Sequence, residues 1–377
     1  MKKILVLYAK YGGGHLSAAN AITTYIEEHY YGTCEVKCVD LMEYISPFLN
    51  KTTTDAYKQM AKHAPKLWKT VYYNSRKGFL SHISNKANEL MAKKLLKLYK
   101  DFSPDIIISA HPFGTQMTSY LKETGKFSCT LATVLTDFAP HEQWLVGQEY
   151  CEYFFVSNEK MREDMIDNYG TPAEKIFATG VPLANTFSYP FYDDQTREKY
   201  HLKEDKKLIL FFGGGEFGLG QKRTLQILES LTKHLDKYQI IAVSGKNKKM
   251  NKRFTEIAER VNNPDLHVIK YCTDVPDIMH ISTLVVTKPG GLTSSESLAS
   301  QLPIIITNPI PGQEEENAEF LESSGVAVWL KKTDDINAVI SDILNNPEKL
   351  QEMKEKTKLI AKPNSTRDIC KKVLGDF

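Results

Sequence analysis

Short, nearly continuous apolar runs recur along the chain and alternate with stretches of helical period. Residues 2–15 and 206–220 each form such a run and then enter a glycine-rich segment, and helical period follows at 16–30 and 222–234. A continuous apolar run is typical of a strand that is buried on both faces of a parallel sheet. Further runs of this kind lie at 35–41, 105–110, 130–136, 153–156, 239–244, 266–270, 283–287 and 304–307.

This alternation, repeated in two similar halves, predicts an α/β protein with two doubly wound, Rossmann-like domains that face a cleft. Prolines and a glycine at 179–190 interrupt every periodic pattern, so we expect the boundary between the two domains there. The predicted domains are 1–185 and 186–362, and a C-terminal helix at 363–377 is expected to pack back on the first. Ligands of such sheets bind at the carboxyl ends of the strands, so the loops there are the candidate sites.

Charge is distributed unevenly along the chain. The 377 residues are 42% hydrophobic and 25% charged, which excludes a disordered or collagenous chain, and the net charge is only +2. Residues 51–100, however, contain twelve Lys/Arg and two Asp/Glu, while the other 327 residues have 36 basic and 44 acidic side chains. The near-neutral total therefore hides a strongly basic segment.

The chain shows no targeting signal that we can identify. The apolar run at 4–9 is shorter than a signal-peptide core, and no run approaches the length that spans a bilayer. The six cysteines are scattered, so we expect buried free thiols in a reducing cytosol and no zinc site. The expected location is the cytosol or the cytosolic face of a membrane.

The first glycine-rich loop, at 12–14, precedes His15 and opens a helix. Its glycines let a ligand approach the backbone, and a helix N-terminus attracts negative charge. The glycine fingerprint of dinucleotide-binding proteins fits this loop poorly. Ser17 occupies the position of the third glycine or alanine, and Asp40 lies further along the chain than the acidic residue that would bind the ribose. His15 is either a helix-start residue without chemistry or a general base, and its place at the rim of the expected cleft favours the base.

The second half carries several polar loops at predicted strand ends. Residues 213–218 are rich in glycine, 244–247 follow the next strand, and 289–291 end a later one. Thr293 or Ser294 then starts a helix, so Glu296 is either the capping-box partner of Thr293 or a first-turn carboxylate that accepts ribose hydroxyls. Amide and acid groups at 311–317 suit the hydroxyls of a sugar.

These motifs make the chain recognisable. The loop at 11–15, Thr136-Asp137 with His141 and Trp144, and the segments 179–182, 244–247, 288–296 and 311–317 resemble the diacylglycerol glycosyltransferases. That family includes plant monogalactosyldiacylglycerol synthase and the bacterial processive diacylglycerol β-glucosyltransferases. The chain is more distantly similar to the peptidoglycan enzyme that adds GlcNAc to a lipid-linked precursor.

The resemblance implies a GT-B fold, with a UDP-sugar on the C-terminal domain and the acceptor on the N-terminal one. It places Glu296 on the UDP ribose, the amides after Gly290 and Gly291 on the diphosphate, and Gln313 on the hexose. The residues expected to bind the UDP-sugar are Gly213, Gly214, Ser244, Gly245, Lys246, Tyr271, Pro289, Gly290, Gly291, Thr293, Glu296, Gln313, Glu314 and Asn317. Those expected at the acceptor are Gly13, Gly14, His111, Pro112 and Trp144.

The basic segment also interleaves cations with aromatic residues, a combination that suits a membrane interface with anionic lipids. We expect 65–80 to dock there, whereas 85–99 fits a solvated basic helix equally well. No nucleic-acid-binding motif accompanies the segment. The residues expected to dock are Lys66, Trp68, Lys69, Tyr72, Tyr73, Arg76, Lys77 and Phe79.

The expected reaction moves glucose or galactose from a UDP-sugar to diacylglycerol in one displacement with inversion. His15 is the expected base, and Asp137 is the second choice, as base or as the group that orients an imidazole. Because no Asp-x-Asp occurs and backbone amides can stabilise the leaving diphosphate, we expect no metal and no other cofactor. GlcNAc transfer to another lipid, a UDP-sugar epimerase and a non-catalytic sensor stay open as alternatives.

Overall fold

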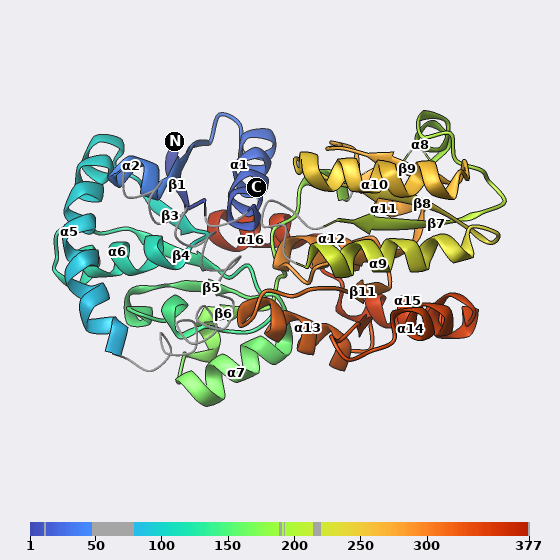
Figure 1. Cartoon of the computed structure of the whole chain (residues 1–377). Helices are drawn as coiled ribbons and strands as arrows, with labels where there is room; N and C mark the ends of the chain where they lie inside the picture. Colours follow the sequence, from blue (N-terminus) through green and yellow to red (C-terminus); the bar gives the residue numbers. More distant parts are fainter. Residues whose placement is uncertain (11–12, 47–78, 188–190, 192, 214–219, 376–377) are drawn as a thin grey trace. The chain divides into compact units, whose positions relative to one another are not determined.

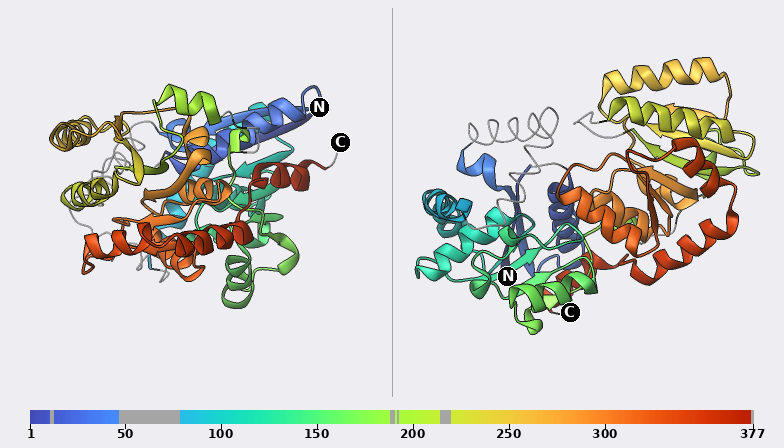
Figure 2. Two further views of the ribbon diagram at one scale, coloured as in Figure 1. Left: turned by 90° about the vertical axis from the view of Figure 1, so that its right-hand side faces the viewer. Right: turned by 60° about the horizontal axis from the view of Figure 1, so that its bottom comes forward.

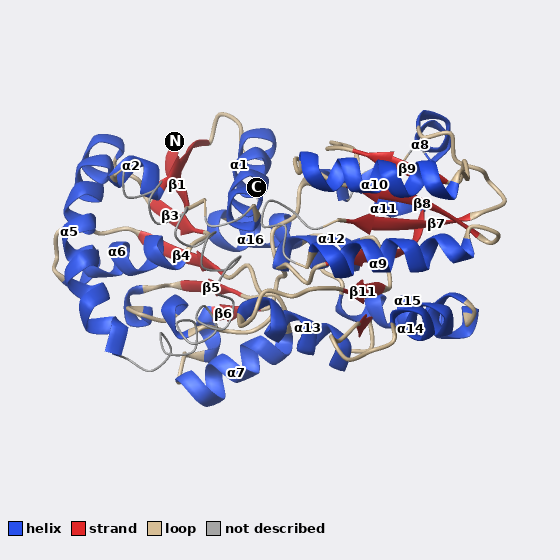
Figure 3. Cartoon of the chain, in the orientation of Figure 1, coloured by secondary structure: helices blue, strands red, loops and turns tan. Residues whose placement is uncertain are grey.

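The computed structural model describes residues 1–10, 13–46, 79–187, 191, 193–213 and 220–375, with the backbone alone at 79–90. The chain divides into two compact units. The first consists of Met1–Asn185, Pro311–Gln313 and Lys362–Phe377, and the second of Thr186–Ile310 and Glu314–Ala361. Each unit has a parallel sheet with helices on both faces (Figure 1 and Figure 3). The predicted α/β class with two doubly wound, Rossmann-like domains is confirmed.

The sheet of the first unit has the strand order β2-β1-β3-β4-β5-β6. Its strands are β1 (Lys2–Tyr8), β2 (Cys34–Asp40), β3 (Ile106–Ser109), β4 (Thr130–Val134), β5 (Tyr153–Phe155) and β6 (Ile176–Phe177). The helices of this unit are α1 (Gly14–His29), α2 (Leu41–Ile45), α5 (Phe79–Phe102), α6 (Pro112–Glu123), α7 (Glu159–Tyr169) and α16 (Ser365–Leu374).

The sheet of the second unit has the order β12-β11-β10-β7-β8-β9. Its strands are β7 (Lys207–Phe212), β8 (Tyr238–Val243), β9 (Leu266–Ile269), β10 (Ser282–Thr287), β11 (Ile304–Ile306) and β12 (Ala327–Trp329). Its helices are α8 (Asp193–Lys199), α9 (Gln221–Leu231), α10 (Lys248–Val261), α11 (Val275–Ile281), α12 (Gly291–Ala299), α13 (Gln313–Ser323), α14 (Ile336–Leu344) and α15 (Pro347–Ile360).

Burial on both faces explains the continuous apolar run of β1. Leu5 and Leu7 belong to one buried cluster, with residues of α5 and α6, while Ile4 and Val6 belong to a second cluster, with residues of α1 and α16. Successive side chains of a strand point to opposite faces, so each residue from Ile4 to Leu7 needs an apolar side chain. The sequence pattern and the packing therefore have the same cause.

The C-terminal helix α16 packs within the first unit. The hydroxyls of Ser365 and Thr366 donate to the carbonyls of Val181 and Leu183, at 2.7 and 2.6 Å. Ile369 and its neighbours are buried against α1, and the two helices lie side by side in Figures 1 and 2. The last helix therefore contributes to the core beneath β1.

The strand and helix bounds differ from the predicted ones by a few residues. The short strands β6 and β12 were not predicted, because runs of two or three residues give no periodic signal. The predicted strand at 130–136 ends at Val134, which leaves Thr136 in the following loop. The six cysteines are free thiols, of which Cys151 and Cys370 are buried and the others are half-buried rather than buried.

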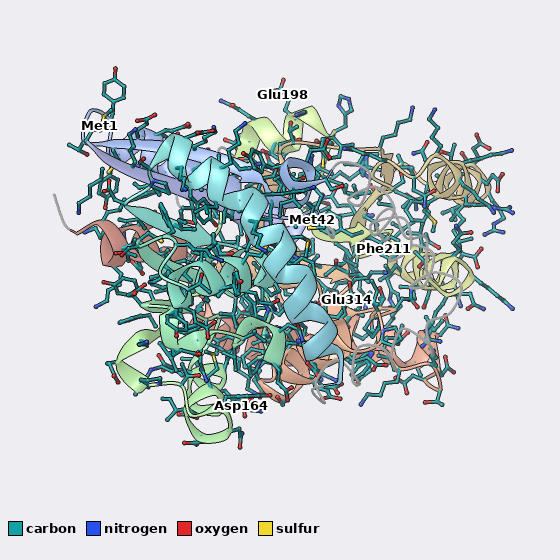
Figure 4. All side chains as sticks on the ribbon, turned by 90° about the vertical axis from the view of Figure 1, so that its left-hand side faces the viewer. Met1, Met42, Asp164, Glu198, Phe211 and Glu314 are labelled. Atoms are coloured by element: carbon teal, nitrogen blue, oxygen red, sulfur yellow. The ribbon has the colours of Figure 1, made fainter. Side chains whose placement is uncertain are left out.

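Most of the basic segment lies outside the described residues, including Lys66, Trp68, Lys69, Tyr72, Tyr73, Arg76 and Lys77. Phe79 begins α5, and its side chain is not described. Helix α5 runs along one side of the first unit, with the buried Met42 of α2 near it (Figure 4). The described end of α5 exposes Lys93, Lys97 and Lys100, as expected for a solvated basic face. Among the described helices, none combines the length and hydropathy that a bilayer span requires.

Candidate functional site

The first sheet reverses its winding direction at β1. Strand β2 lies on one side of β1 and β3 on the other, so the loops that follow β1 and β3 leave the same edge from adjacent strands. Parallel α/β sheets bind ligands at such a switch point. One loop leads to His15 in the first turn of α1, and the other carries His111. This edge is therefore the candidate site of the first unit.

Gly13 and Gly14, directly before His15, leave the start of α1 open. Gly13 is the N-cap, without a side-chain hydrogen bond, and Gly14 is the first helical residue. A Cβ atom on Gly13 would meet no heavy atom within 4 Å, so packing within the described residues does not require this glycine. The first turn has no acidic side chain, and its backbone N–H groups favour a partner with negative charge.

The imidazole of His15 is held in one tautomer. Its Nδ1 lies 2.7 Å from the carbonyl oxygen of Ala110 and 3.2 Å from the hydroxyl of Thr136. A carbonyl only accepts hydrogen bonds, so Nδ1 carries the proton and Nε2 has the lone pair. Burial lowers the pKa of His15 to about 4, and the bond to Ala110 only partly offsets this shift. The ring is therefore neutral near pH 7, with a basic nitrogen at Nε2.

Aromatic side chains surround this imidazole. The ring centroid of His111 lies 4.7 Å from that of His15 in a T-shaped contact, and the ring of the buried Trp144 lies 6.1 Å away. His111 is the N-cap of α6, where its Nδ1 accepts a hydrogen bond from the backbone N–H of Phe113, and Pro112 occupies the first turn. The structure thus brings His15, His111 and Trp144 together.

Asp137 does not orient His15 in this structure. Its carboxylate accepts a hydrogen bond from the side-chain amide of Gln313, a residue that groups with the first unit. Within the described chain, the hydrogen bonds of the His15 ring are those to Ala110 and Thr136. The expectation that Asp137 orients this imidazole is therefore wrong, because Nδ1 of His15 donates its hydrogen bond to the backbone carbonyl of Ala110.

The second sheet reverses its direction at β7, which lies between β10 and β8. The loops after β7 and β10 are the two glycine-rich ones, and Gly213 begins the first of them. A Cβ atom on Gly213 would lie 2.5 Å from the ring of Phe254, so core packing alone requires this glycine. Gly214 lies outside the described residues. The glycine at 213 is thus explained without a ligand.

Helix α12 begins earlier than its sequence predicts. Gly290 is the N-cap and Gly291 the first helical residue, so Thr293 is the third residue of the helix and does not cap it. The expected capping box is therefore wrong, and Glu296 lies in the second turn rather than the first. Glycines at the cap leave the N–H groups of the first turn without a side-chain partner, which suits a diphosphate.

Glu296 is half-buried, and its carboxyl group has no hydrogen-bond partner in the described part of the chain. Burial raises its pKa to about 8. The hydroxyl of Ser294, one turn of helix from the cap, is also buried and unpaired. Polar groups that are withdrawn from water normally have partners, so the Ser294 hydroxyl and the half-buried Glu296 carboxyl point to a ligand with hydroxyl groups.

Two residues of α13 brace the neighbouring loops. The side-chain amide of the fully buried Asn317 donates to the carbonyl of Pro289 at 3.0 Å. The carboxylate of Glu314 accepts from the backbone N–H of Ile310 at 2.6 Å. Both side chains therefore already have partners in the protein. The Asn317 amide holds the loop at 289–291, and the Glu314 carboxylate holds the loop at 310–313.

Tyr271 is an exposed aromatic residue at the carboxyl edge of the second sheet. It is 65% exposed, and the ammonium group of Lys246 lies 5.4 Å from the centre of its ring. Gly245, before that lysine, has a φ of 60°, a left-handed conformation that favours glycine. The hydroxyl of Ser244 donates to the carbonyl of Ile269. The exposed ring offers a flat face on which a nucleobase can stack.

Sequence reasoning missed Ala110 and the role of Thr136 in holding His15. Every residue has a backbone carbonyl, so residue type does not indicate which carbonyl accepts a hydrogen bond. The sequence indicated only that His15 and His111 follow two predicted strands and so lie near the same edge of the sheet. The described residues contain no group of three or more metal-binding side chains.

Comparisons with known proteins show the family to which the chain is related. Residues 15–183 match the family Monogalactosyldiacylglycerol (MGDG) synthase, and residues 193–359 match Glycosyl transferases group 1. The chain is 30% identical, over 375 residues, to proteins named Processive diacylglycerol beta-glucosyltransferase from Bacillus cereus (strain 03BB102) and Bacillus anthracis (strain A0248). Each alignment covers 99% of this chain and 94% of the relative.

Solved structures share the fold at low sequence identity. MnaA of S. aureus, in a co-structure with UDP, has a TM-score of 0.65 at 14% identity and covers 100% of this chain and 98% of its own. MurG of Acinetobacter baumannii has a TM-score of 0.64 at 15% identity and covers 98% of each chain. The UDP-GlcNAc 2-epimerase of Neisseria meningitidis has a TM-score of 0.62 at 13% identity and covers 99% of this chain and 100% of its own.

These likenesses show the GT-B fold, as predicted. The motifs that carried the resemblance extend along the same residues that the relatives match, from the loop before His15 to the helix that starts at Gln313. The predicted resemblance is therefore confirmed, and the chain belongs to the glycosyltransferase family that contains the processive diacylglycerol beta-glucosyltransferases.

Proposed function

We propose that this protein transfers glucose or galactose from a UDP-sugar to diacylglycerol at the cytosolic face of a membrane, with inversion to a β-glycoside. The observation that carries the proposal is the His15 imidazole, which is neutral and has its basic Nε2 at the switch point of the first sheet. The names of the 30%-identical relatives support the acceptor and the reaction. The structural neighbours solved with UDP or UDP-GlcNAc support the donor.

The proposed reaction is a single displacement. The acceptor hydroxyl gives its proton to Nε2 of His15 as its oxygen bonds to the anomeric carbon of the sugar, and the bond from that carbon to the diphosphate breaks as UDP leaves. A lowered pKa keeps His15 neutral, so Nε2 is available as a base without prior deprotonation. Asp137 is the second candidate for the base.

The second unit supplies the proposed donor site. The half-buried carboxyl group of Glu296 binds the ribose hydroxyls, the ring of Tyr271 stacks on the uracil, and the amides after Gly290 and Gly291 hold the diphosphate. As charge develops on the leaving UDP, the open start of α12 stabilises it. We propose that the reaction needs neither a metal ion nor another cofactor.

The basic segment is the proposed route to the acceptor. Lysines and aromatic residues at 65–80 combine attraction to anionic headgroups with insertion at the interface. A peripheral protein bound in this way reaches a lipid substrate without a membrane-spanning helix. We therefore propose anionic lipids as a second partner, beside diacylglycerol.

A transfer assay tests the function as a whole. Incubation with labelled UDP-glucose, UDP-galactose or UDP-GlcNAc and diacylglycerol liposomes is expected to yield a β-linked hexosyl diacylglycerol from a glucose or galactose donor. Chromatography identifies the sugar, the acceptor and the number of sugars added. A lipid product from UDP-GlcNAc alone would contradict the proposed donor, and an epimerised UDP-sugar without a lipid product would identify an epimerase.

Replacement of His15 by alanine tests the base. His15→Ala is expected to lower kcat by about 100-fold or more, the usual contribution of a general base, while the Kd for UDP stays unchanged. Because the wild-type pKa of His15 is about 4, wild-type activity should persist well below pH 6. Turnover within a few-fold of wild type in His15→Ala, with Asp137→Asn inactive, would assign the base to Asp137.

Replacement of Glu296 by glutamine tests the ribose contact. The Kd for UDP is expected to rise about 2- to 10-fold, because one hydrogen bond between the neutral carboxyl group and a ribose hydroxyl is lost. The folded protein holds a proton on Glu296 up to about pH 8, but the unfolded chain loses it near pH 4.5. The stability of the wild type relative to Glu296→Gln should therefore fall as the pH rises from 4.5 to 8. Calorimetry measures both effects, and unchanged UDP affinity would exclude the contact.

Vesicle flotation tests the membrane contact. The protein should float with vesicles that contain anionic lipid but not with neutral ones, and about 0.5 M salt should release it because the Debye length then falls to a few ångströms. Changing Lys66, Lys69, Arg76 and Lys77 to glutamine should abolish flotation. The matched control changes four lysines of α15, Lys349, Lys354, Lys356 and Lys358, and should float like wild type. If both variants lost flotation equally, binding would depend on the total charge of the protein and not on the basic segment.

A further inference from the structure

The burial of His15 has a cost for its proposed role as a base. Burial lowers the pKa of the imidazole to about 4 and keeps the ring neutral near pH 7. A general base, however, becomes an imidazolium when it takes the proton of the acceptor hydroxyl. In surroundings of low polarity, that charge is costly unless hydrogen-bond acceptors face it. The partners of the ring therefore decide how well His15 can act as a base.

Two oxygen atoms face Nδ1 of His15. The carbonyl oxygen of Ala110 lies 2.7 Å from this nitrogen, and the hydroxyl oxygen of Thr136 lies 3.2 Å from it. Because the bond to the carbonyl fixes the proton on Nδ1, this nitrogen can only donate, and the Thr136 hydroxyl accepts from it. The Nδ1–H group is thus shared between two acceptors, in a three-centre hydrogen bond.

The backbone on both sides of the buried Thr136 is held in place. The N–H of Leu135 donates to the carbonyl of Phe155 at 2.9 Å, and the carbonyl of Asp137 accepts from the hydroxyl of Ser157 at 2.7 Å. Phe155 is the last residue of β5, and Ser157 follows two residues later. The place of the Thr136 side chain is therefore set by the protein before any substrate binds.

Both hydrogen bonds at Nδ1 strengthen as the ring becomes charged. Hydrogen bonds with an ionised partner are roughly twice as strong as neutral ones. An interaction that is stronger in the transition state than in the ground state raises kcat. The carbonyl of Ala110 belongs to the backbone, so the Thr136 hydroxyl is the acceptor that depends on residue type.

We propose that Thr136 is a positioning residue of the transfer reaction, whose hydroxyl oxygen holds the His15 ring and stabilises the imidazolium that forms when Nε2 takes the acceptor proton. The proton on Nδ1 stays on the ring throughout this step. The inference rests on the proposed function and adds to it a residue that acts on turnover through His15.

Substitutions separate the hydroxyl of Thr136 from its packing. Thr136→Val keeps the shape but removes the acceptor, and Thr136→Ser keeps the hydroxyl but removes the methyl group. Thr136→Ala also removes the hydroxyl and replaces the valine variant if that protein does not fold. The matched control is Thr133→Val in β4, because the buried hydroxyl of Thr133 bonds to that of Thr115 at 2.8 Å and not to His15.

Steady-state kinetics with diacylglycerol vesicles and a saturating UDP-sugar test the role in turnover. Thr136→Val should lower kcat about 5- to 10-fold and leave the KM for diacylglycerol and the Kd for UDP within about 2-fold of wild type. Thr136→Ser should keep kcat within about 2-fold of wild type. Thr133→Val should unfold at a lower temperature but turn over like wild type.

NMR of protein labelled with ¹⁵N-histidine tests the contact without any turnover. The Nδ1–H resonance of His15 is the one that is missing from His15→Ala. This proton should exchange slowly with water in wild type, Thr136→Ser and Thr133→Val. In Thr136→Val its line should broaden, because the ring has lost one of its two acceptors.

The outcomes distinguish this inference from the proposed function. If wild type is active and Thr136→Val turns over equally fast, or if Thr136→Ser is as slow as Thr136→Val, the inference is overturned and the proposed function stands. An equal fall of kcat in Thr133→Val would also overturn it, because lost stability would then explain the slower turnover. If wild type forms no glycolipid, the proposed function itself is overturned.

Discussion

The hydrogen bond from Nδ1 of His15 to the carbonyl of Ala110 is the contact on which the chemistry of the first unit depends. It ties the loop after β1 to the loop after β3, across the switch point of the sheet. Because the partner is a carbonyl, it leaves one possible tautomer and places the lone pair on Nε2. Burial keeps the ring neutral, and the bond to this carbonyl only partly offsets that effect.

Both units use the same geometric device for different tasks. In each sheet the loops on either side of a reversal in strand order carry the candidate residues, and in each a glycine-capped helix starts there. At the edge of the first unit, the imidazole rings of His15 and His111 lie beside the indole ring of Trp144. The second presents open amides, a half-buried carboxyl group and an exposed tyrosine, which suit a nucleotide.

Glycine-rich loops that look alike in sequence have different physical causes. Gly213 is required because the ring of Phe254 occupies the space of a Cβ atom, whereas a Cβ atom on Gly13 or Gly290 would meet no heavy atom of the described residues within 4 Å. Packing therefore accounts for the glycine at 213, whereas close approach of a ligand could account for those at 13 and 290. In the same way, Asn317 and Glu314 read as sugar-binding residues in the sequence, yet both brace neighbouring backbone in the structure.

The sequence by itself determined the class of fold, the location of the polar loops at the strand ends and the family, because buried parallel strands need continuous apolar runs and loops between them need particular residues. The tertiary structure alone decided what each polar group contacts. Ala110 and Thr136 lie 95 and 121 residues from His15, and a backbone carbonyl has no signature in residue type. Likewise, Glu296 fits a capping box by spacing, but the helix starts at Gly291 and leaves the half-buried carboxyl group without a partner among the described residues. Spacing reports local geometry, whereas burial depends on the packing of the whole unit.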